Sequence, residues 1–253
     1  MASAKEIVVK PITAAAANEV VKRIHYSGKV VQNSQLHFGV FLDGRLEGAM
    51  QFGPPINKKG TIEVVANTKW NGMIELNRMA FSEALPRNSE SRAMAVAFRL
   101  IRRNYPHIEW IVSFSDGTQC GDGAIYRACG FVLTDVRVSD ALRVNPVTGE
   151  VVHVIQAHHL LISKEFRTWE AKKGYQMRYV YFLDPACRGR LTVPVLPFSK
   201  IADMDASMYR GKKLRRVKKQ DSEHPSELGG AVPTDTLQLS PEDDPNAQQQ
   251  TAN

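Results

Sequence analysis

Polar residues follow an apolar run in the middle of this 253-residue chain. The run Trp110–Phe114 leads directly into Ser115, Asp116 and Gly117. A glycine-broken loop comes next, followed by a short helix expected at Gly123–Cys129. Enzymes with α/β folds place reactive side chains at the carboxyl end of a strand in this way. Because Asp-Gly is also a common turn dipeptide, the segment is either a functional site or a turn.

Two side chains of this segment could take part in proton transfer. Asp116 could accept a proton as a general base, and the alternative is a turn-forming aspartate before Gly117. Tyr126, in the short helix, could protonate a leaving group or stack on a base. The alternative for Tyr126 is a half-buried tyrosine of the core. If both residues are functional, we expect them to face the same crevice.

A second group of polar side chains lies at the end of the first expected helix, Ala14–Ile24. His25 and Tyr26 follow this helix directly, beside a Ser27-Gly28 turn. A histidine in this place could serve as an acid, a base or a metal ligand. Arg78, in an expected strand, could hold a carboxylate or phosphate of a donor, and a structural salt bridge is the alternative.

Metal ligation has two candidate arrangements. His158 and His159 are adjacent, and neighbouring residues of a strand point to opposite faces, so they cannot readily chelate one ion. His25 and Asp116, with Tyr126, could form a site for iron or zinc if the fold brings them together. The sequence therefore leaves the metal unknown.

The charge is distributed unevenly along the chain. Residues 220–253 hold seven acids and no Lys or Arg, so residues 1–219 carry 33 bases against 19 acids, a net charge of +14. A field of this strength favours a polyanionic partner, and we expect nucleic acid. The alternative is a basic protein whose charge only keeps it soluble.

Composition also indicates the cellular setting. No stretch approaches ~18 apolar residues, which argues against a membrane-spanning helix. The N-terminal residues MASAKEIVVKPI lack the order of a secretory signal. The three cysteines are widely spaced and form no CxxC motif, which is typical of reduced thiols in a cytoplasmic protein.

Hydrophobic periodicity predicts alternating strands and helices in one body, residues 1–205. The expected helices are Ala14–Ile24, Glu90–Asn104 and Gly123–Cys129. The expected strands are Glu6–Val9, Leu36–Leu42, Leu46–Phe52, Gly72–Phe81, Glu109–Ser115, one from Phe131, Val151–His158, Met177–Leu183 and Leu191–Val195. In the strand Gly72–Phe81, alternation puts Met73, Glu75, Asn77 and Met79 on one side and Ile74, Leu76 and Arg78 on the other.

The remaining residues, 206–253, differ in character from this body. Residues 210–219, RGKKLRRVKK, hold seven bases, and the acidic segment after them is rich in Pro, Ser and Gln. Such a composition buries little apolar surface, so we expect a largely disordered tail. The basic run could bind phosphate, direct localisation or simply be a solvated charge run.

The order of these elements resembles the acyltransferase fold of the GCN5-related N-acetyltransferases. Tyr126, Gly130 and Phe131 match the Y-x-x-x-G-F that ends a helix of that family. The resemblance implies an α/β (α+β) fold with an acetyltransferase-like mixed, mostly antiparallel central sheet flanked by helices. It also implies that a loop and helix after the fourth strand hold the pyrophosphate of coenzyme A.

The expected phosphate loop of that fold departs from the family's pattern. Its position is occupied by residues 87–93, RNSESRA, where both glycines of Q/R-x-x-G-x-G/A are absent and Glu90 would repel a phosphate. The resemblance gives Arg78, Ser89, Ser91 and Arg92 as the candidate cofactor-binding residues.

A set of short motifs resembles a narrower family, the phage Mom proteins. The motifs are HYS (25–27), ELNRM (75–79), NSES (88–91), SFSDG (113–117) and IYRACGF (125–131). Those proteins convert adenine in phage DNA to its N6-carbamoylmethyl (acetamido) derivative, which blocks host restriction enzymes. The resemblance implies four catalytic residues, His25, Tyr26, Asp116 and Tyr126. It implies three substrate-binding residues, Ser27, Ser113 and Ser115.

This resemblance makes double-stranded DNA the expected partner, in the cytoplasm of a bacterial host cell, and a dimer is possible. The target base must leave the duplex, which costs a few kcal/mol of unstacking. Tyr26, Phe52 and Trp70 are candidates to sandwich the extruded base, although core packing is the better interpretation of Phe52.

The donor is open between acetyl-CoA and a glycine-derived carbamoylmethyl donor. Acetyl transfer would give an amide, whereas the family's product is attached through a methylene carbon. Iron or another metal could also take part. Two other functions remain: an N-acetyltransferase that uses acetyl-CoA on a protein or small amine, and a basic DNA-binding module without catalysis.

Overall fold

The computed structural model describes residues 3–117, 123–149, 151–153, 166–204, 206, 208–209 and 212–213. These belong to the first of two compact units, Met1–Arg215; the second, Arg216–Asn253, lies outside the described residues. Most of the basic run 210–219 also lies outside them. The boundary expected at residue 205 therefore stays a prediction.

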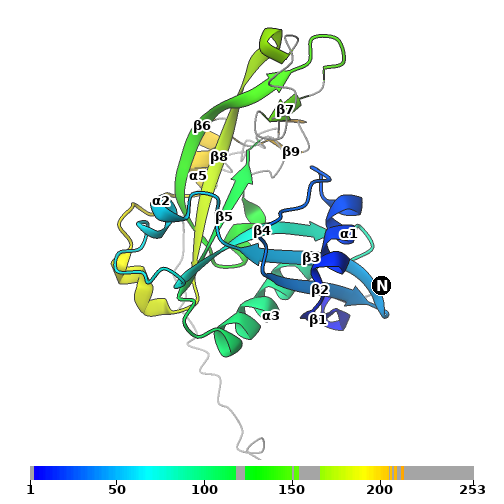
Figure 1. The fold of residues 1–253 in the computed structure, drawn as a ribbon, viewed down its shortest axis with the longest axis vertical. Helices are drawn as coiled ribbons and strands as arrows, with labels where there is room; N and C mark the ends of the chain where they lie inside the picture. Colours follow the sequence, from blue (N-terminus) through cyan, green and yellow to red (C-terminus); the bar gives the residue numbers. More distant parts are fainter. Residues whose placement is uncertain are drawn as a thin grey trace, which may run out of the picture. The chain divides into compact units, whose positions relative to one another are not determined.

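An eight-stranded sheet forms the centre of this unit (Figure 1). Its strands stand in the order β1-β2-β3-β4-β5-β8-β6-β7, and β4 and β5 are its one parallel pair. Their bounds are β1 (Val8–Pro11), β2 (Leu36–Leu42), β3 (Arg45–Gly53), β4 (Met73–Phe81), β5 (Trp110–Asp116), β6 (Val132–Val144), β7 (Val151–His153) and β8 (Glu170–Phe182). Two short strands, β9 (Met208–Tyr209) and β10 (Lys212–Lys213), pair separately. The mixed, mostly antiparallel sheet expected from the sequence is confirmed.

Helices cover both faces of the sheet. The α-helices are α1 (Ala14–Ile24), α2 (Lys58–Ile62), α3 (Ser89–Asn104), α4 (Ala124–Ala128) and α5 (Ser199–Asp203), and the 3-10 helices are η1 (Ala4–Glu6), η2 (Phe166–Thr168) and η3 (Pro185–Arg190). The apolar stripe of α1 packs on Ala49 and Ala80. The stripe of α3 packs on the opposite face, in the largest core cluster, together with Tyr126 of α4.

A β-bulge changes which side chains of β4 share a face. The register with β3 pairs Met50 with Met79 and Gln51 with Arg78, and then shifts so that Phe52 pairs with Leu76. Asn77 is therefore the extra residue, and alternation reverses after it. Met79 joins Leu76 in the core beneath α3, while Arg78 lies on the face of Glu75. The expected grouping, with Met79 beside Glu75 and Arg78 opposite, is wrong for this reason.

Three expected strands differ from the observed bounds by two or more residues or extend outside the described residues. The strand expected at Glu6–Val9 begins at Val8, because Ser3 and Glu6 form a capping box around the 3-10 helix η1. The strand β8 begins at Glu170 instead of Met177. Of the strand expected at Val151–His158, β7 ends at His153 and the rest lies outside the described residues.

The strand expected at Leu191–Val195 is wrong. Only Leu191 makes a bridge, with Val65, and the Thr192 N–H donates to the Val64 carbonyl at 3.0 Å. This segment binds the loop before β4 instead of joining the sheet.

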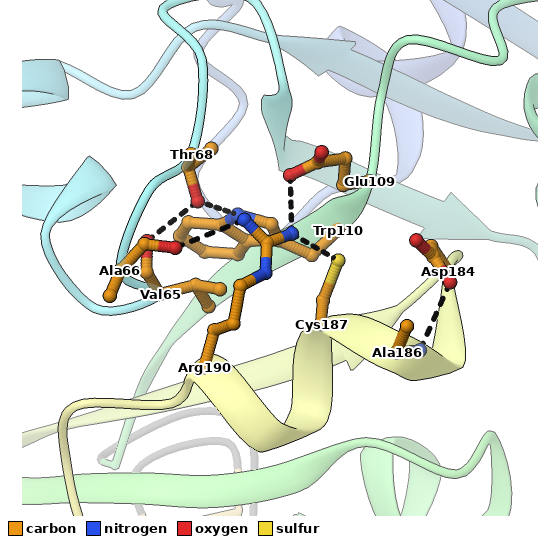
Figure 2. A network of polar contacts seen from close by, with 9 residues as sticks. All are labelled: Val65, Ala66, Thr68, Glu109, Trp110, Asp184, Ala186, Cys187 and Arg190. Atoms are coloured by element: carbon orange, nitrogen blue, oxygen red, sulfur yellow. Dashed lines mark hydrogen bonds and ion pairs between the residues drawn. The ribbon is translucent and has the colours of Figure 1, made fainter.

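Arg190 connects the loop before β4 to the start of β5 through hydrogen bonds, as Figure 2 shows. Its guanidinium donates to the Ala66 carbonyl at 3.0 Å, to a Glu109 carboxylate oxygen at 2.7 Å and to the Cys187 sulfur at 2.8 Å. The Trp110 indole donates to Thr68 at 3.0 Å in the same network. One side chain therefore ties three segments that are far apart in the sequence.

Candidate functional site

The strands β4 and β5 part after a short parallel pairing. Met73–Glu75 pair with Trp110–Val112, and no further residues of the two strands are in register. Beyond this point β4 pairs with β3 and β5 pairs with β8, so the strands diverge (Figure 1). Backbone groups at a divergence have no partner strand on one side, which makes the place accessible to a ligand.

Glu75 is the last residue of β4 to pair with β5, and it is half-buried. Burial raises its pKa to about 7, against the opposing effects of a hydrogen bond from Asn77 and the charge of Arg78. A carboxyl with this pKa can exchange a proton near neutral pH. Glu75 was only part of a motif in the sequence. The signal that could have found it is a single acid among the apolar residues Met73, Ile74 and Leu76 at the start of β4.

Arg78 lies on the same face and holds the chain after α1. Its Nε donates to the Lys29 carbonyl at 3.1 Å, and its Nη1 donates to the Asn77 carbonyl at 2.7 Å. Burial lowers the pKa of Arg78, and the neighbouring Tyr26 and Glu75 act in the opposite direction. The structure thus brings the predicted residues Arg78 and Tyr26 together with Glu75.

His25 joins this group as the C-terminal cap of α1. The Ser27 backbone N–H donates to its Nδ1 at 3.1 Å, and the Ser27 hydroxyl lies 2.8 Å from the same nitrogen. Burial, with a further effect of the Arg78 charge, lowers the pKa of His25 to about 4. The ring is therefore neutral at pH 7, with Nδ1 as an acceptor. Tyr26 lies 4.3 Å away between ring centroids and is 56% exposed.

Tyr126 lies on the other face of the sheet, where it is buried. Its ring stacks on Tyr179 with centroids 4.0 Å apart. Its hydroxyl is 3.1 Å from the Ser113 hydroxyl, which also lies 3.4 Å from the Leu76 carbonyl oxygen. The Tyr126 hydroxyl is therefore close to the point where β4 and β5 part. Ser115, two residues along β5, has a buried hydroxyl with no hydrogen-bond partner among the described residues.

Asp116 lies on the opposite face of β5 from Ser113 and Ser115. Side chains alternate along a strand, so Asp116 shares the face of Phe114 and Val112. Val112 packs in a cluster with Met73, which places this face on the side of Glu75. Asp116 pairs with Gln176 of β8 in the strand register. The two predicted catalytic residues Asp116 and Tyr126 thus approach the sheet from opposite sides, instead of sharing one crevice.

The expected phosphate loop forms the start of α3. Asn88 precedes the helix with φ 71°, a left-handed conformation that asparagine adopts more readily than most residues. Asn88 thus has a backbone conformation that favours glycine, although the pattern expects no glycine at this position. Ser89 is buried, and the Ser91 hydroxyl donates to the Asn88 carbonyl at 3.1 Å. Arg92 is exposed and reaches the Lys5 carbonyl at 3.4 Å.

The described residues contain no group of three or more His, Cys, Asp or Glu side chains arranged to hold a metal ion. His158 and His159 lie outside them. Among the helices in the described part of the chain, none is long and apolar enough to cross a membrane.

The fold is a mixed, mostly antiparallel α/β sheet, with a candidate site where its two parallel strands part. The chain belongs to the Mom protein family, whose model matches residues 6–200. It is 36% identical over 210 residues to "Methylcarbamoylase mom" of Escherichia phage Mu, covering 78% of this chain and 85% of that protein.

Two solved structures align with most of this chain at low sequence identity. The IAA acetyltransferase from Bacillus cereus aligns with 70% of this chain and 99% of its own at 11% identity, with a TM-score of 0.43. FeeM, an N-acyl amino acid synthase from uncultured soil microbes, aligns with 74% of this chain and 95% of its own at 15% identity, also with a TM-score of 0.43.

Proposed function

We propose that this chain transfers a carbamoylmethyl group to the exocyclic amine of adenine in double-stranded DNA. Membership of the Mom family supports this reaction, and the phage Mu relative carries the name methylcarbamoylase. The observation that carries the proposal to particular residues is the half-buried Glu75, with a pKa raised to about 7, at the divergence of β4 and β5.

The chemistry requires a base, because the lone pair of the adenine amine is delocalised into the ring. In the proposed step, the N6 nitrogen forms a bond to the methylene carbon of an activated carbamoylmethyl donor. The bond from that carbon to the leaving group breaks, and the N6 proton passes to the Glu75 carboxylate. A general base of this kind contributes about 10²- to 10⁴-fold to the rate.

The neighbouring residues take the roles of positioning and recognition in this proposal. Arg78 orders the chain around Lys29 and provides the positive charge next to Glu75. His25 is neutral and offers hydrogen bonds, while the exposed ring of Tyr26 would stack on a base. Asp116 would provide a second carboxylate on the acceptor side in this proposal.

The donor would bind on the other side of the divergence in this proposal. Tyr126, with Ser113 and Ser115, lies there and would face the leaving group. Ser89, Ser91 and Arg92 at the start of α3 would receive a phosphate if the donor is a coenzyme A derivative. The donor itself stays open between this class and a glycine-derived one.

The basic body would supply the attraction to DNA. Residues 1–219 carry a net charge of +14, which favours phosphate contacts regardless of sequence. In a bacterial host cell, the modified adenines would protect phage DNA from restriction.

The test is mass spectrometry of nucleosides from plasmid DNA of cells that express the chain. We expect a carbamoylmethyl-deoxyadenosine peak, and cells that express Glu75→Gln at the same level should lack it. An unmodified deoxyadenosine peak alone, at good expression, contradicts the proposal. Binding of acetyl-CoA with no change to DNA would favour the N-acetyltransferase function. Function that survives Asp116→Ala but not deletion of residues 210–219 would favour a DNA-binding module.

A further inference from the structure

The loop between β3 and α2 carries an aliphatic side chain in an unusual position. Ile56 is 91% exposed, which is the highest exposure among the large apolar residues of the described chain. An isolated exposed apolar residue is ordinary on a protein surface. Ile56 differs because the chain on both sides of it is fixed and because it stands next to the candidate site.

The residues on either side hold Ile56 in place. Before it, Pro54 and Pro55 restrict the backbone, and the Asn33 side chain donates to the Pro54 carbonyl at 2.7 Å. After it, Asn57 caps α2, with its side chain accepting from the Gly60 N–H at 3.1 Å. Little conformational entropy remains to be lost at this tip when it enters a partner.

The tip is also close to the residues proposed for the acceptor side. Gly53, the last residue of β3, is in register with Glu75. A Cβ added to Gly53 would lie 2.7 Å from the Asn77 side-chain oxygen, so the two strands are tightly packed there. Ile56 follows Gly53 by three positions along the chain, a span of at most about 11 Å.

Positive and aromatic side chains follow this tip along the segment 54–72. Lys58 lies 4.6 Å from the centre of the Trp70 ring, which is 59% exposed, and donates to the Asn71 side chain at 3.2 Å. Lys59 and Lys69 are exposed. The segment 54–72 has three lysines and one acid, Glu63, and its charge is therefore complementary to a phosphate backbone.

We propose that Ile56 inserts into the DNA base stack at the position that the extruded adenine leaves. This inference rests on the proposed function, since it assigns the residue that opens the duplex for that reaction. Apolar side chains inserted between bases stabilise an unstacked duplex, and extrusion of a base otherwise costs a few kcal/mol. Lys58, Lys59 and Lys69 hold the phosphates on either side of the opening.

The test compares Ile56→Ala with two matched variants. Ile56→Leu keeps an aliphatic side chain at the tip. Val147→Ala truncates a valine that is 90% exposed on the turn between β6 and β7, away from this loop in the sequence. Modified deoxyadenosine is measured in plasmid DNA from expressing cells. Permanganate oxidation of unstacked thymines is measured on the same plasmid with purified full-length protein, and this second assay requires no donor.

We expect Ile56→Ala to lower both the modified fraction and the thymine reactivity by about tenfold, with DNA affinity changed less than about threefold. Ile56→Leu and Val147→Ala should match the wild type. Three results would each overturn the inference. Ile56→Ala could modify DNA as fully as the wild type, or it could lose modification while thymine reactivity is retained. The third such result is a wild type that modifies adenine without exposing any thymine. Thymine reactivity that depends on Ile56, without any modified adenine, would contradict the proposed function and support the inference.

Discussion

Burial favours the neutral form of two side chains at the candidate site. It raises the pKa of Glu75 to about 7 and lowers the pKa of His25 to about 4. Arg78 is thus the cation between a neutral imidazole and a carboxyl that ionises near neutral pH. A base with such a pKa is partly ionised at neutral pH and can still hold the proton that it accepts.

The rate of adenine modification should therefore depend on the ionisation of Glu75. As the pH rises through about 7, the carboxylate fraction grows, and we expect the rate to rise and then level off. Glu75→Gln should lower the rate by about 10²-fold or more and remove this dependence. Single-turnover rates measured across pH, once a donor is supplied, check both expectations. An unchanged pH profile in the variant would show that another group titrates.

A stability measurement tests Glu75 without any donor. The folded pKa of Glu75 is raised, so the folded chain holds this proton up to about pH 7, while the unfolded chain releases it near the ordinary pKa of 4.5. The wild type therefore loses stability from this group as the pH rises through that window. Glu75→Gln removes the ionisation. The melting temperature of this variant should therefore rise relative to that of the wild type between about pH 5 and pH 8. A constant difference between the two melting curves would mean that the Glu75 pKa is not raised.

A substitution of Tyr126 tests the role of this single residue on the donor side. Tyr126→Phe keeps the ring on Tyr179 and removes the hydroxyl near Ser113. We expect the free energy of unfolding to fall by only about 1 kcal/mol, with a loss of about tenfold or more in modification. Urea unfolding and nucleoside mass spectrometry measure the two effects. Full modification by a stable Tyr126→Phe variant would assign the hydroxyl to packing alone.

At the scale of elements, two irregularities position the site. The divergence of β4 and β5 places Glu75 and Ser113 on two strands at one opening. The bulge at Asn77 then turns Arg78 toward Glu75 and the chain after α1. Regular pairing of β4 with β5 would have closed the opening, and regular pairing of β4 with β3 would have put Arg78 beneath α3.

The network around Arg190 should stabilise the elements near the start of β5. Arg190→Met leaves the partly buried Glu109 without its ion pair and the Ala66 carbonyl without its donor. We expect the free energy of unfolding to fall by about 2 kcal/mol, because the pair is about three-quarters shielded from solvent and not fully buried.

Arg188→Met is the matched control, since Arg188 is exposed in the same short helix η3. Urea unfolding of both variants at equal pH measures the difference. Equal stability of the two would show that the Arg190 contacts contribute nothing net.

At the scale of the whole molecule, charge separates along the chain. The first 219 residues carry +14 and the last 34 carry seven acids without a base. We expect such an acidic segment to compete with DNA for the Lys and Arg side chains of residues 1–219. The net charge of +7 therefore understates the field that DNA would meet.

Neutralising the acidic tail should strengthen DNA binding. Replacing its seven acids with Asn or Gln keeps the length, and we expect about tenfold tighter binding at low ionic strength. The gain should shrink several-fold as salt approaches about 0.3 M, because salt screens both competitors. Fluorescence anisotropy with a labelled duplex over a salt series provides the measurement. A gain that is independent of salt would point to a conformational effect instead of charge competition.

Most elements could be predicted from hydrophobic periodicity and from turn and capping residues, because these signals act locally. Thr13 and the Asp43-Gly44 turn mark the ends of α1 and β2 as expected. Periodicity failed at Leu191–Val195, where an apolar run binds a loop instead of the sheet. Hydrophobic alternation indicates that a face is buried, without saying against which partner.

The sequence by itself determined the class of fold and the family, because motifs and local patterns lie along the chain. It named His25, Tyr26 and Arg78 only as separate candidates. Only the tertiary structure decided that Glu75 joins them and that Asp116 and Tyr126 lie on opposite faces. The reason is that a one-residue bulge or a strand's alternation sets the direction of every side chain after it. The pKa values follow from burial, which exists only when distant segments of the chain pack together.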